Sequence, residues 1–593
     1  MHFNNALASS AFVVAASASI IGSERIPLIG PSFPTNFDLS TSNHLEDART
    51  EFSSRLEQLF STGKLNQTDL VFAVDVFSAN TNGSIYSKLH VGEGQEQILT
   101  AGELNFDTIG RLGSVSKLVT AYGLLAEAGI EVFSHPVTKY FPELLSNSTA
   151  PNRINWEEIT VGAVASHQAG TGGTGGMFVT PARIHNICFT HTNFSTTDYF
   201  LKVQNGLEMT VDSYIDFLRD EKRPTMAAHR NALYSDAGYS LLGHLLGRIT
   251  GQSYPEAIQK VLFDRLGLNS STAFPPIPGP NVNAMNRTLI YPESYFNIDS
   301  PITAASGGVF GSISDLRKIG LSILNSELLS PATTRAWMKP LSATGSLVDL
   351  VGAPWEINRL TIPATPGSNY TRVSDLYTKA GGNGDYTCIL ALSPDHGIGY
   401  SFLIAGSTAS KARWPLRQAL GEVFIPAAER AAAENAEKNF AGMFVDTSAG
   451  NSTTNMTITF DDGQPGLGVK DFYLEGKESG HLFLGQTKPV PASYRIYPTG
   501  PSETSQSLVE MYRSEGTIRV SQRVVYYASP LPPRAAALGG EGLFENQLEW
   551  NNVGFSGAID ELVFEITDGK LVSITVVGAE TWIGKPLVLQ RLD

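Results

Sequence analysis

The pattern of hydrophobic residues changes near residue 440, and this change constrains the fold of the chain more than any other feature. Before that point, segments with apolar residues at helical spacing alternate with short runs typical of strands. After it, only short strand-like runs occur, and the sequence TDGK at 567–570 predicts a hairpin turn between two of them. We therefore predict a mixed domain of helices and strands at about 41–435 and an all-β domain at about 440–593.

Periodicity and turn residues predict the individual elements. We expect helices at 43–62, 114–128, 240–250, 255–266 and 414–439, and a glycine ends the second of them. Strands of the mixed domain are expected at 70–78, 84–91, 374–379, 385–392 and 399–405. Strands of the C-terminal domain are expected at 455–460, 493–498, 508–512, 518–527, 561–566 and 571–577.

Composition limits the classes of partner. The 42 basic and 57 acidic residues give a net charge of −15, which disfavours nucleic acid and anionic membranes because both require a basic surface. Hydrophobic residues make up 42% of the chain, enough for a large core. The two cysteines exclude a disulfide scaffold and a four-cysteine zinc site, and no H-x-x-H or H-E-x-x-H motif occurs. We expect neither a metal nor a cofactor.

The N-terminal residues predict the compartment. Residues 6–21 are apolar or small, and the small-x-small pattern at 16–18 predicts a signal peptide over residues 1–18, with a disordered start as the alternative. A proline-rich linker is expected over 19–40, and the C-terminal end LVLQRLD indicates no membrane anchor. Glycosylation, and with it a secreted eukaryotic protein, is indicated by nine N-x-S/T sequons, at Asn66, Asn82, Asn147, Asn193, Asn269, Asn286, Asn369, Asn451 and Asn455.

One motif combines a nucleophile with a base. In GSVSK, Ser114 and Lys117 lie one helical turn apart at the start of an amphipathic helix. A serine hydroxyl is a weak nucleophile until a neighbouring base takes its proton, and a desolvated lysine is able to do so. The alternative is a helix-capping serine and a solvated lysine. A second S-x-x-K, Ser61 to Lys64, is not followed by an apolar helix, so we rank it lower.

Six sequence motifs, taken in their order along the chain, resemble those of a known family. They are LGSVSKLVTAYGLLAEAG, PVTKYFPEL, ITVGAVASHQAG, YSDAGYSLLGHLLGRITG, GGVFGSISDLRKI and YTKAGGNGDYT, in that order. Over about residues 68–405 the chain resembles the serine β-lactamase-like family, which includes class C β-lactamases, penicillin-binding proteins, esterases and transesterases. The resemblance implies an α+β fold, an α/β sandwich in which an antiparallel sheet is flanked by helices, with a helical subdomain beside it. It also implies an acyl-enzyme on the serine.

The resemblance assigns roles residue by residue. It implies that Ser114 is the nucleophile and Lys117 its base, and that Tyr234 in YSD is the proton-transferring tyrosine of the family's Y-x-N motif. Lys379 and Gly381 in KAG match the K-T-G strand motif, where the lysine supplies positive charge beside the tyrosine.

Further positions follow from the same resemblance. The backbone N–H groups of Ser114 and Gly382 are expected to form the oxyanion hole. His167 in SHQAG is expected to hold a loop by hydrogen bonds, with contact to the substrate as the alternative.

The chain departs from the family pattern at two positions. Asp236 replaces the usual asparagine, so an ionised carboxylate would pair with a lysine and hold it cationic, whereas a protonated one would imitate the amide. Ala380 replaces the usual threonine, which weakens the case for carboxylate-bearing β-lactams as substrates.

The two cysteines leave two alternatives. Cys188 and Cys388 either form a disulfide that ties the long segment 170–230 to the edge of the site or remain free.

These observations predict a secreted serine hydrolase that cleaves a small ester, amide or lactam. Two alternatives remain: an acyltransferase or transesterase acting on a metabolite, and a non-catalytic binding protein that keeps the fold. A peptidoglycan peptidase fits the family but not a glycosylated protein. The expected partner is a small acyl substrate, and the sequence makes no prediction of the oligomeric state.

Overall fold

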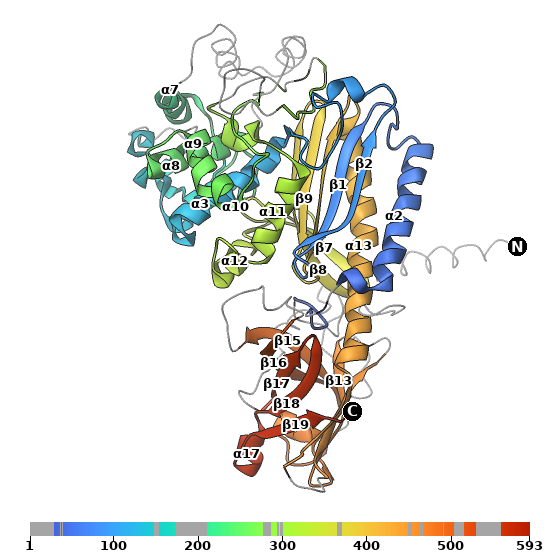
Figure 1. Cartoon of the computed structure of the whole chain (residues 1–593). Helices are drawn as coiled ribbons and strands as arrows, with labels where there is room; N and C mark the ends of the chain where they lie inside the picture. Colours follow the sequence, from blue (N-terminus) through green and yellow to red (C-terminus); the bar gives the residue numbers. More distant parts are fainter. Residues whose placement is uncertain are drawn as a thin grey trace, which may run out of the picture.

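A large antiparallel sheet with helices on both faces is followed by a separate barrel (Figure 1). The computed structural model describes residues 29–35, 37, 39–146, 153–172, 210–276, 286–292, 294, 296, 301–363, 371–448, 453–461, 464, 466–489, 492–502, 515–528 and 559–592. The predicted signal peptide and the predicted strand at 508–512 lie outside these residues.

The large sheet has eight strands in the order β2-β1-β10-β9-β8-β7-β6-β5. Every residue of β1, β9 and β10 is buried, because these strands are covered by helices on both faces. The strands are β1 Val71–Ser78, β2 Gly83–Val91, β5 Ser342–Ala343, β6 Asp349–Val351, β7 Glu356–Pro363, β8 Thr371–Asn383, β9 Tyr386–Ser393 and β10 Ile398–Ala405. The short strands β3 Gly110–Arg111 and β4 Phe310–Gly311 pair separately.

Two hydrophobic cores lie on opposite faces of this sheet. One is formed with α2 and α13, and the other with the helical subdomain that contains α3, α8 and α11 (Figure 1). The helices are α2 Asn43–Ser61, α3 Ser116–Ala128, α4 Val161–Ala165, α7 Val211–Asp216, α8 Asp236–Thr250, α9 Tyr254–Ile258, α10 Asp264–Leu266, α11 Ile313–Leu324, α12 Pro331–Trp337, α13 Ala409–Asn439 and α17 Ala579–Ile583.

The C-terminal domain is a closed β-barrel. Its sheet runs β12-β11-β19-β18-β17-β16-β15-β13-β14, and an additional pairing of β12 with β13 closes the ring. Closure removes exposed strand edges. The strands are β11 Gly442–Val445, β12 Asn455–Phe460, β13 Leu467–Leu474, β14 Lys477–Glu478, β15 Ala492–Ser502, β16 Thr517–Ala528, β17 Glu561–Thr567, β18 Lys570–Val576 and β19 Leu587–Arg591.

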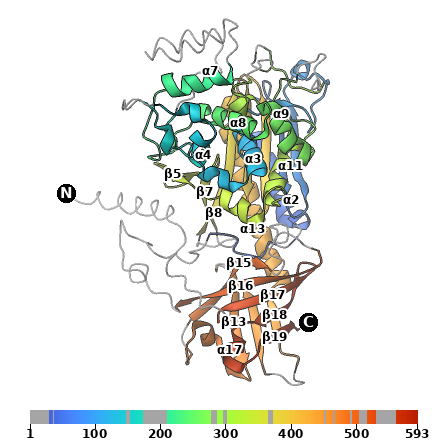
Figure 2. The ribbon, with the colours of Figure 1, turned by 90° about the vertical axis from the view of Figure 1, so that its left-hand side faces the viewer.

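Helix α13 joins the two parts (Figure 2). Its first three-quarters, as far as Ala431, pack on the large sheet, whereas Ala432, Ala433 and Ala436 belong to the hydrophobic core of the barrel. The segment that we predicted as a linker also contributes to this junction, because Phe33 is buried in the barrel core.

The predicted fold class is confirmed: an α+β domain with a sheet flanked by helices precedes an all-β domain. Details differ. Helix α8 begins at Asp236 and not at residue 240, because the Ser235 hydroxyl caps it by accepting the N–H of Gly238 at 3.0 Å. The single helix expected at 255–266 is divided into α9 and α10 by a π-helical turn over Gln259–Phe263.

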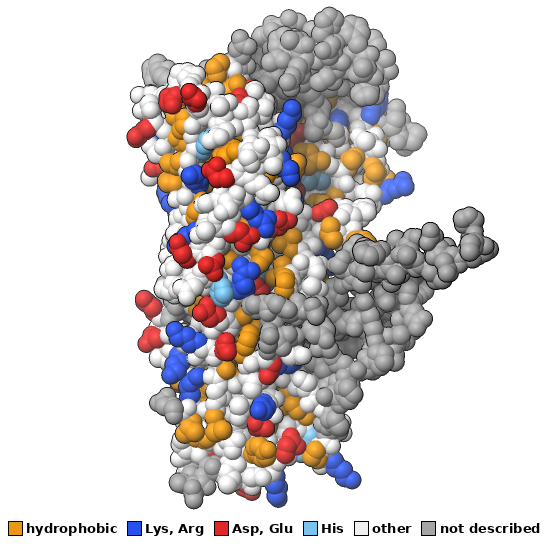
Figure 3. Space-filling view, turned by 90° about the vertical axis from the view of Figure 1, so that its right-hand side faces the viewer, with side chains coloured by type: hydrophobic (Ala, Val, Ile, Leu, Met, Phe, Trp, Pro, Cys, Tyr) orange, Lys and Arg blue, Asp and Glu red, His pale blue; other side chains and the backbone are white. Residues whose placement is uncertain are grey.

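The described surface is mixed in charge. On the face shown in Figure 3, Lys and Arg side chains are interspersed with Asp and Glu, and the coloured residues form no continuous basic area. None of the described helices combines the length and the apolar character that crossing a membrane requires.

Candidate active site

Ser114 and Lys117 are brought together as their spacing predicts. Ser114 lies in a 3₁₀ turn, Gly113–Val115, that leads directly into α3, and Gly113 has a φ of +54°, which favours glycine. Lys117 lies in the first turn of α3 and is completely buried. Its ammonium group donates to the Ser114 hydroxyl at 3.2 Å.

The Lys117 ammonium has two closer partners. It donates to the Asp236 carboxylate at 2.5 Å and to the Ser306 backbone carbonyl at 2.6 Å. An ammonium has three N–H donors and no lone pair, so these bonds and the one to Ser114 use its full capacity. In this protonation state, Lys117 orients the serine hydroxyl but cannot accept its proton.

Asp236 occupies the first residue of α8 and is buried. A carboxylate is favoured there because the N-terminus of a helix carries partial positive charge. Its side chain points to Lys117, so of the two pairings open from the sequence, the structure has the one with Lys117 and not that with Lys379.

Two ammonium groups lie close to the ring of Tyr234. The Lys117 nitrogen is 4.8 Å from the ring centre, and the Lys379 nitrogen is 5.2 Å from it. The imidazole of His167 stacks on the ring at a centroid distance of 4.6 Å. The three residues that were predicted separately from distant motifs therefore contact one tyrosine, which is half-buried.

Lys379 is held by a residue that the sequence did not single out. Its ammonium pairs with the Glu356 carboxylate, whose other oxygen accepts the backbone N–H of Ala380 at 2.9 Å. Burial alone would lower the pKa of Lys379, but Glu356 and the Tyr234 phenol outweigh it and raise that pKa above its usual value. Lys379 is thus a fixed positive charge.

His167 is a buried neutral imidazole. Burial, together with the nearby charges of Lys117 and Lys379, places its pKa well below the usual value. Its Nδ1 accepts the backbone N–H of Ser235 at 3.1 Å, so the proton of the neutral ring resides on Nε2. This bond ties the loop at 167 to the segment that carries Tyr234 and Asp236, in line with the expected positioning role.

The glycines of strand β8 permit close contact with the Ser114 turn. A Cβ at Gly381 would lie 2.0 Å from the Leu112 carbonyl oxygen and 2.8 Å from the Ser114 nitrogen. A Cβ at Gly113 would lie 2.6 Å from the Gly382 nitrogen. The two backbone N–H groups expected in the oxyanion hole therefore belong to segments in direct contact.

A cavity of about 370 Å³ opens over these groups. Strand β8 and helix α13 supply most of its wall, and its lining comprises Ser114, Tyr234, Glu356, Lys379, Ala380, Gly382, Asn383, Gly384, Tyr386, Ser410, Arg413 and Trp414. Sequence reasoning missed Glu356, Arg413 and Trp414, because a single charged or aromatic residue in a strand or helix carries no motif.

Other predicted positions lie away from this cavity or outside the described residues. Ser61 is at the exposed end of α2, where its hydroxyl donates to the Gln58 carbonyl and not to Lys64. Cys388 is buried in β9, and its predicted partner Cys188 lies outside the described residues. Asn66, Asn82, Asn269 and Asn286 are exposed, Asn455 is half-buried, and Asn147, Asn193, Asn369 and Asn451 lie outside the described residues.

Two family models match different parts of the chain. The family described as "Beta-lactamase" matches residues 86–421, and the one described as "Beta-lactamase-like-like, C-terminal domain" matches residues 432–586. A "Beta-lactamase-like protein" of Arthroderma benhamiae is 26% identical over 519 residues, which cover 81% of this chain and 82% of the relative.

Two further relatives are named as hydrolases. "Probable hydrolase M10" of a Phoma species is 24% identical over 73% of this chain and 70% of its own length. "Probable hydrolase clz13" of Cochliobolus lunatus is 24% identical over 70% of this chain and 68% of its own length.

Solved structures were also compared. A β-lactamase/D-alanine carboxypeptidase from Yersinia pestis complexed with citrate has a TM-score of 0.46 and 20% identity, covering 64% of this chain and 99% of that one. A class C β-lactamase from Rhodobacter sphaeroides has a TM-score of 0.43 and 20% identity, covering 63% of this chain and 99% of that one. Since the first family match spans more than half of the sequence, the protein belongs to the beta-lactamase family.

Proposed function

We propose that the protein is a serine hydrolase that forms an acyl-enzyme on Ser114 and cleaves a small ester, amide or lactam. The observation that carries this proposal is the 3.2 Å contact between the buried Lys117 ammonium and the Ser114 hydroxyl at the floor of a cavity. In the reaction, the Ser114 oxygen adds to the substrate carbonyl, the leaving group departs with a proton, and water then releases the acyl group. Family membership and the relatives named as hydrolases support this reaction class.

The proton of Ser114 requires an acceptor. Lys117 becomes one when its ammonium group gives up a proton, to Asp236 across the 2.5 Å hydrogen bond or to water, which leaves a neutral amine beside the serine. Tyr234 lies over the same cavity and is suited to deliver a proton to the leaving group. We assign Lys117 as the base for Ser114 and Tyr234 as the acid for the leaving group.

Arg413 favours a substrate with an anionic group. Its guanidinium lies over Gly382, where a Cβ would be 2.1 Å from its terminal nitrogen, and it donates to the Thr387 hydroxyl. Among the described residues it forms no ion pair, and burial lowers its pKa although Glu356 opposes this effect. A carboxylate on the substrate would supply the missing counter-charge.

A fluorophosphonate probe followed by peptide mapping tests the proposal. We expect labelling on the peptide that contains Ser114, loss of labelling in Ser114→Ala, and unchanged labelling in Ser61→Ala, which alters the other S-x-x-K serine. A panel of nitrophenyl esters, amino-acid amides and a chromogenic cephalosporin then identifies the substrate class. Absence of labelling at Ser114 in folded protein refutes the acyl-enzyme.

One observation favours a second candidate, a binding protein without catalysis. All three donors of Lys117 are occupied, and Asp236 stabilises its cationic form. If this pairing persists with substrate bound, the cavity binds an acyl compound without cleaving it. Saturable binding of a nitrophenyl ester without release of nitrophenol would support this candidate over the first.

We further propose that the protein is secreted and glycosylated. The support is the exposure of Asn66, Asn82, Asn269 and Asn286, whose side chains are open to an oligosaccharide. Expression in a eukaryotic host should place the protein in the medium, and an endoglycosidase should lower its apparent mass. Retention inside the cell with an unchanged mass would contradict both statements.

A further inference from the structure

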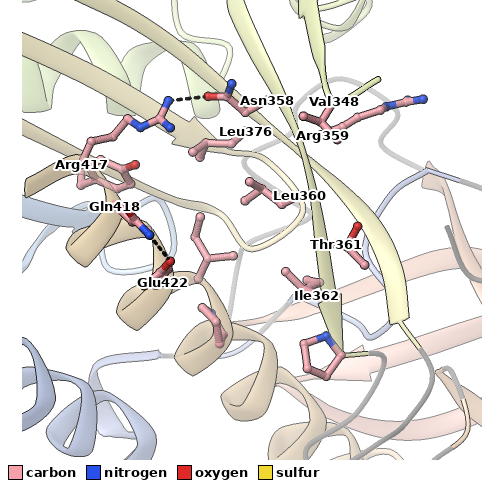
Figure 4. Close-up of a pocket in the computed structure, with 15 residues that line it drawn as sticks. Val348, Asn358, Arg359, Leu360, Thr361, Ile362, Leu376, Arg417, Gln418 and Glu422 are labelled. Carbon is pink, nitrogen blue, oxygen red and sulfur yellow. Dashed lines mark hydrogen bonds between the residues drawn. The ribbon is translucent and has the colours of Figure 1, made fainter. Parts of the chain in front are cut away.

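A second cavity, of about 510 Å³, lies between β7 and α13. In Figure 4, Leu360 and Ile362 on β7 and Leu376 on β8 lie across the cavity from the helix. Most of its lining is aliphatic or aromatic, with Tyr400 and Ile425 completing it from β10 and α13. Cavities of this size and character accommodate small organic molecules.

This cavity and the active-site cavity share their walls. Along β7, Glu356 lines the active-site cavity and Asn358 lines the second one, and residues two apart in a strand face the same side. Along α13, Trp414 lines the first and Gln418 the second, one helical turn further. The two cavities therefore follow one another between the same strand and the same helix.

A polar contact joins the two residues of the second cavity that lie nearest to the active-site cavity along β7 and α13. Arg417 donates to the Asn358 side chain at 2.9 Å (Figure 4). Its guanidinium also lies 5.1 Å from the ring centre of Trp414, which is half exposed. Long arginine side chains change rotamer at low cost. Movement of Arg417 away from Asn358 would join the two spaces.

The floor of the second cavity carries one polar group without a partner. The Tyr400 hydroxyl is buried and forms no hydrogen bond with any described residue. A single hydroxyl without charge leaves the lining predominantly apolar and does not exclude an aliphatic chain from the cavity. Burial raises the pKa of Tyr400, which leaves it a neutral donor.

We infer that the second cavity binds the apolar chain of the substrate whose carbonyl reacts at Ser114. This inference rests on the proposed function and names its substrate class, esters or amides with a medium-length aliphatic chain. The position of the cavity next to the active-site cavity, along the same strand and the same helix, indicates the substrate as occupant, and the aliphatic lining indicates the chemistry. The chain extends past Trp414 once Arg417 has moved.

The kinetic test uses nitrophenyl esters with acyl chains of increasing length. Gly421 lines the cavity, and a Cβ there would have an ordinary contact of 3.4 Å with the Tyr400 hydroxyl. Gly421→Phe should fill the cavity, and Gly421→Ala is the matched control because it leaves most of the space open. Replacing a mid-helix glycine also favours the helix, so both variants should fold.

For the wild type we expect kcat/KM to rise at least about tenfold from acetate to decanoate esters, because each buried methylene contributes to binding. Gly421→Phe should abolish this rise and leave acetate ester hydrolysis within about twofold of the wild type, whereas Gly421→Ala should retain it. An equal rise in Gly421→Phe, or no rise in the wild type, refutes the inference.

A binding experiment separates this inference from the proposed reaction. Decanoate is titrated into Ser114→Ala protein and into the same protein with Gly421→Phe added. Saturable binding that only the second substitution abolishes supports the chain site even if Ser114 proves unreactive in labelling. Equal binding by both proteins places decanoate elsewhere and overturns the chain site, whatever the labelling result.

Discussion

The domain with the large sheet contains two buried ionic clusters that differ in what surrounds them. The active-site cluster consists of Lys117 with Asp236 and Lys379 with Glu356. The structural cluster, defined by Arg372, Asp395, His396 and Glu429, lies between β8, the turn after β9 and helix α13. Both are formed from residues that are far apart in the sequence.

The structural cluster is closed. Glu429 binds Arg372 in a bidentate manner at 2.9 and 2.7 Å, and its second oxygen also contacts His396 Nε2 at 2.7 Å. The other imidazole nitrogen bonds the Ser393 hydroxyl, and none of the four residues lines either of the two cavities described above. Its charges are satisfied by one another.

The active-site cluster satisfies its charges equally well but opens onto a cavity. The side chain of Glu356 is 37% exposed, and Ser114 and Tyr234 are half-buried beside the fully buried lysines. Strong pairing and burial therefore do not distinguish catalysis from stability. The distinction is whether a nucleophile and a proton donor face a space that a substrate can enter. Four substitutions test whether the active-site cluster serves activity and the structural cluster serves stability.

Lys117→Met should have the largest effect, on activity. Methionine preserves the volume and removes the amine, so Ser114 loses its base, and kcat should fall by about 10³-fold or more. Hydrolysis of a nitrophenyl ester measures the loss, and thermal unfolding checks the fold. The matched control is Lys64→Met, the lysine of the other S-x-x-K, which should retain full activity. A variant with near-normal kcat would assign the proton transfer to another group.

Glu429→Gln should have the next largest effect, on stability. Burial opposes ionisation of Glu429, but Arg372 and His396 outweigh it and lower its pKa to about 2. A folded pKa below the unfolded value of about 4.5 stabilises the fold above pH 4.5, by about 3 kcal/mol, and this contribution disappears as pH falls toward 2. The free energy of unfolding should therefore drop by about that amount at pH 7.

The pH dependence of unfolding distinguishes this explanation from a packing defect. The difference between wild type and Glu429→Gln should shrink below pH 4.5, whereas a packing defect would give a constant difference. Activity per folded molecule should remain unchanged, because the structural cluster does not border the active-site cavity. A loss of kcat in the folded variant would contradict the contrast between the two clusters.

The sequence predicts what local spacing determines. The turn from Ser114 to Lys117 follows from helical geometry, and Gly129 ends α3 as expected. The approach of Tyr234 and Lys379 to Ser114 is a tertiary property, and only the ordered motifs of a family resemblance predicted it.

The pairings that the sequence could not predict depend on strand register and helix crossing. Glu356 reaches Lys379 because β7 pairs with β8 so that Glu356 lies opposite Thr378. Arg413 reaches the cavity because α13 crosses the sheet beside Gly382. Neither residue belongs to a motif or to a periodic pattern, so nothing in the sequence singles out either of them.

Glu356→Gln should have a moderate effect. The amide keeps the hydrogen bond to Ala380 but removes the charge that raises the pKa of Lys379. Lys379 should then lose its proton at lower pH. The alkaline limb of the profile of kcat/KM against pH should therefore shift to lower pH, and activity at pH 8 should fall about tenfold. Glu434→Gln, on the exposed side of α13, is the control. An unchanged profile would show that Glu356 only supports the strand.

Asp236→Asn should have the smallest effect and gives the sharpest test of the active-site cluster. The amide oxygen can still accept the Lys117 hydrogen bond that the carboxylate accepts at 2.5 Å, so Lys117 stays beside Ser114. Activity at pH 8 should stay within about threefold of the wild type, measured with a nitrophenyl ester. Asp315→Asn, which alters a buried first-turn carboxylate on α11, is the matched control and should leave activity unchanged. Loss of activity in folded Asp236→Asn would mean that the carboxylate itself must hold the proton that leaves Lys117.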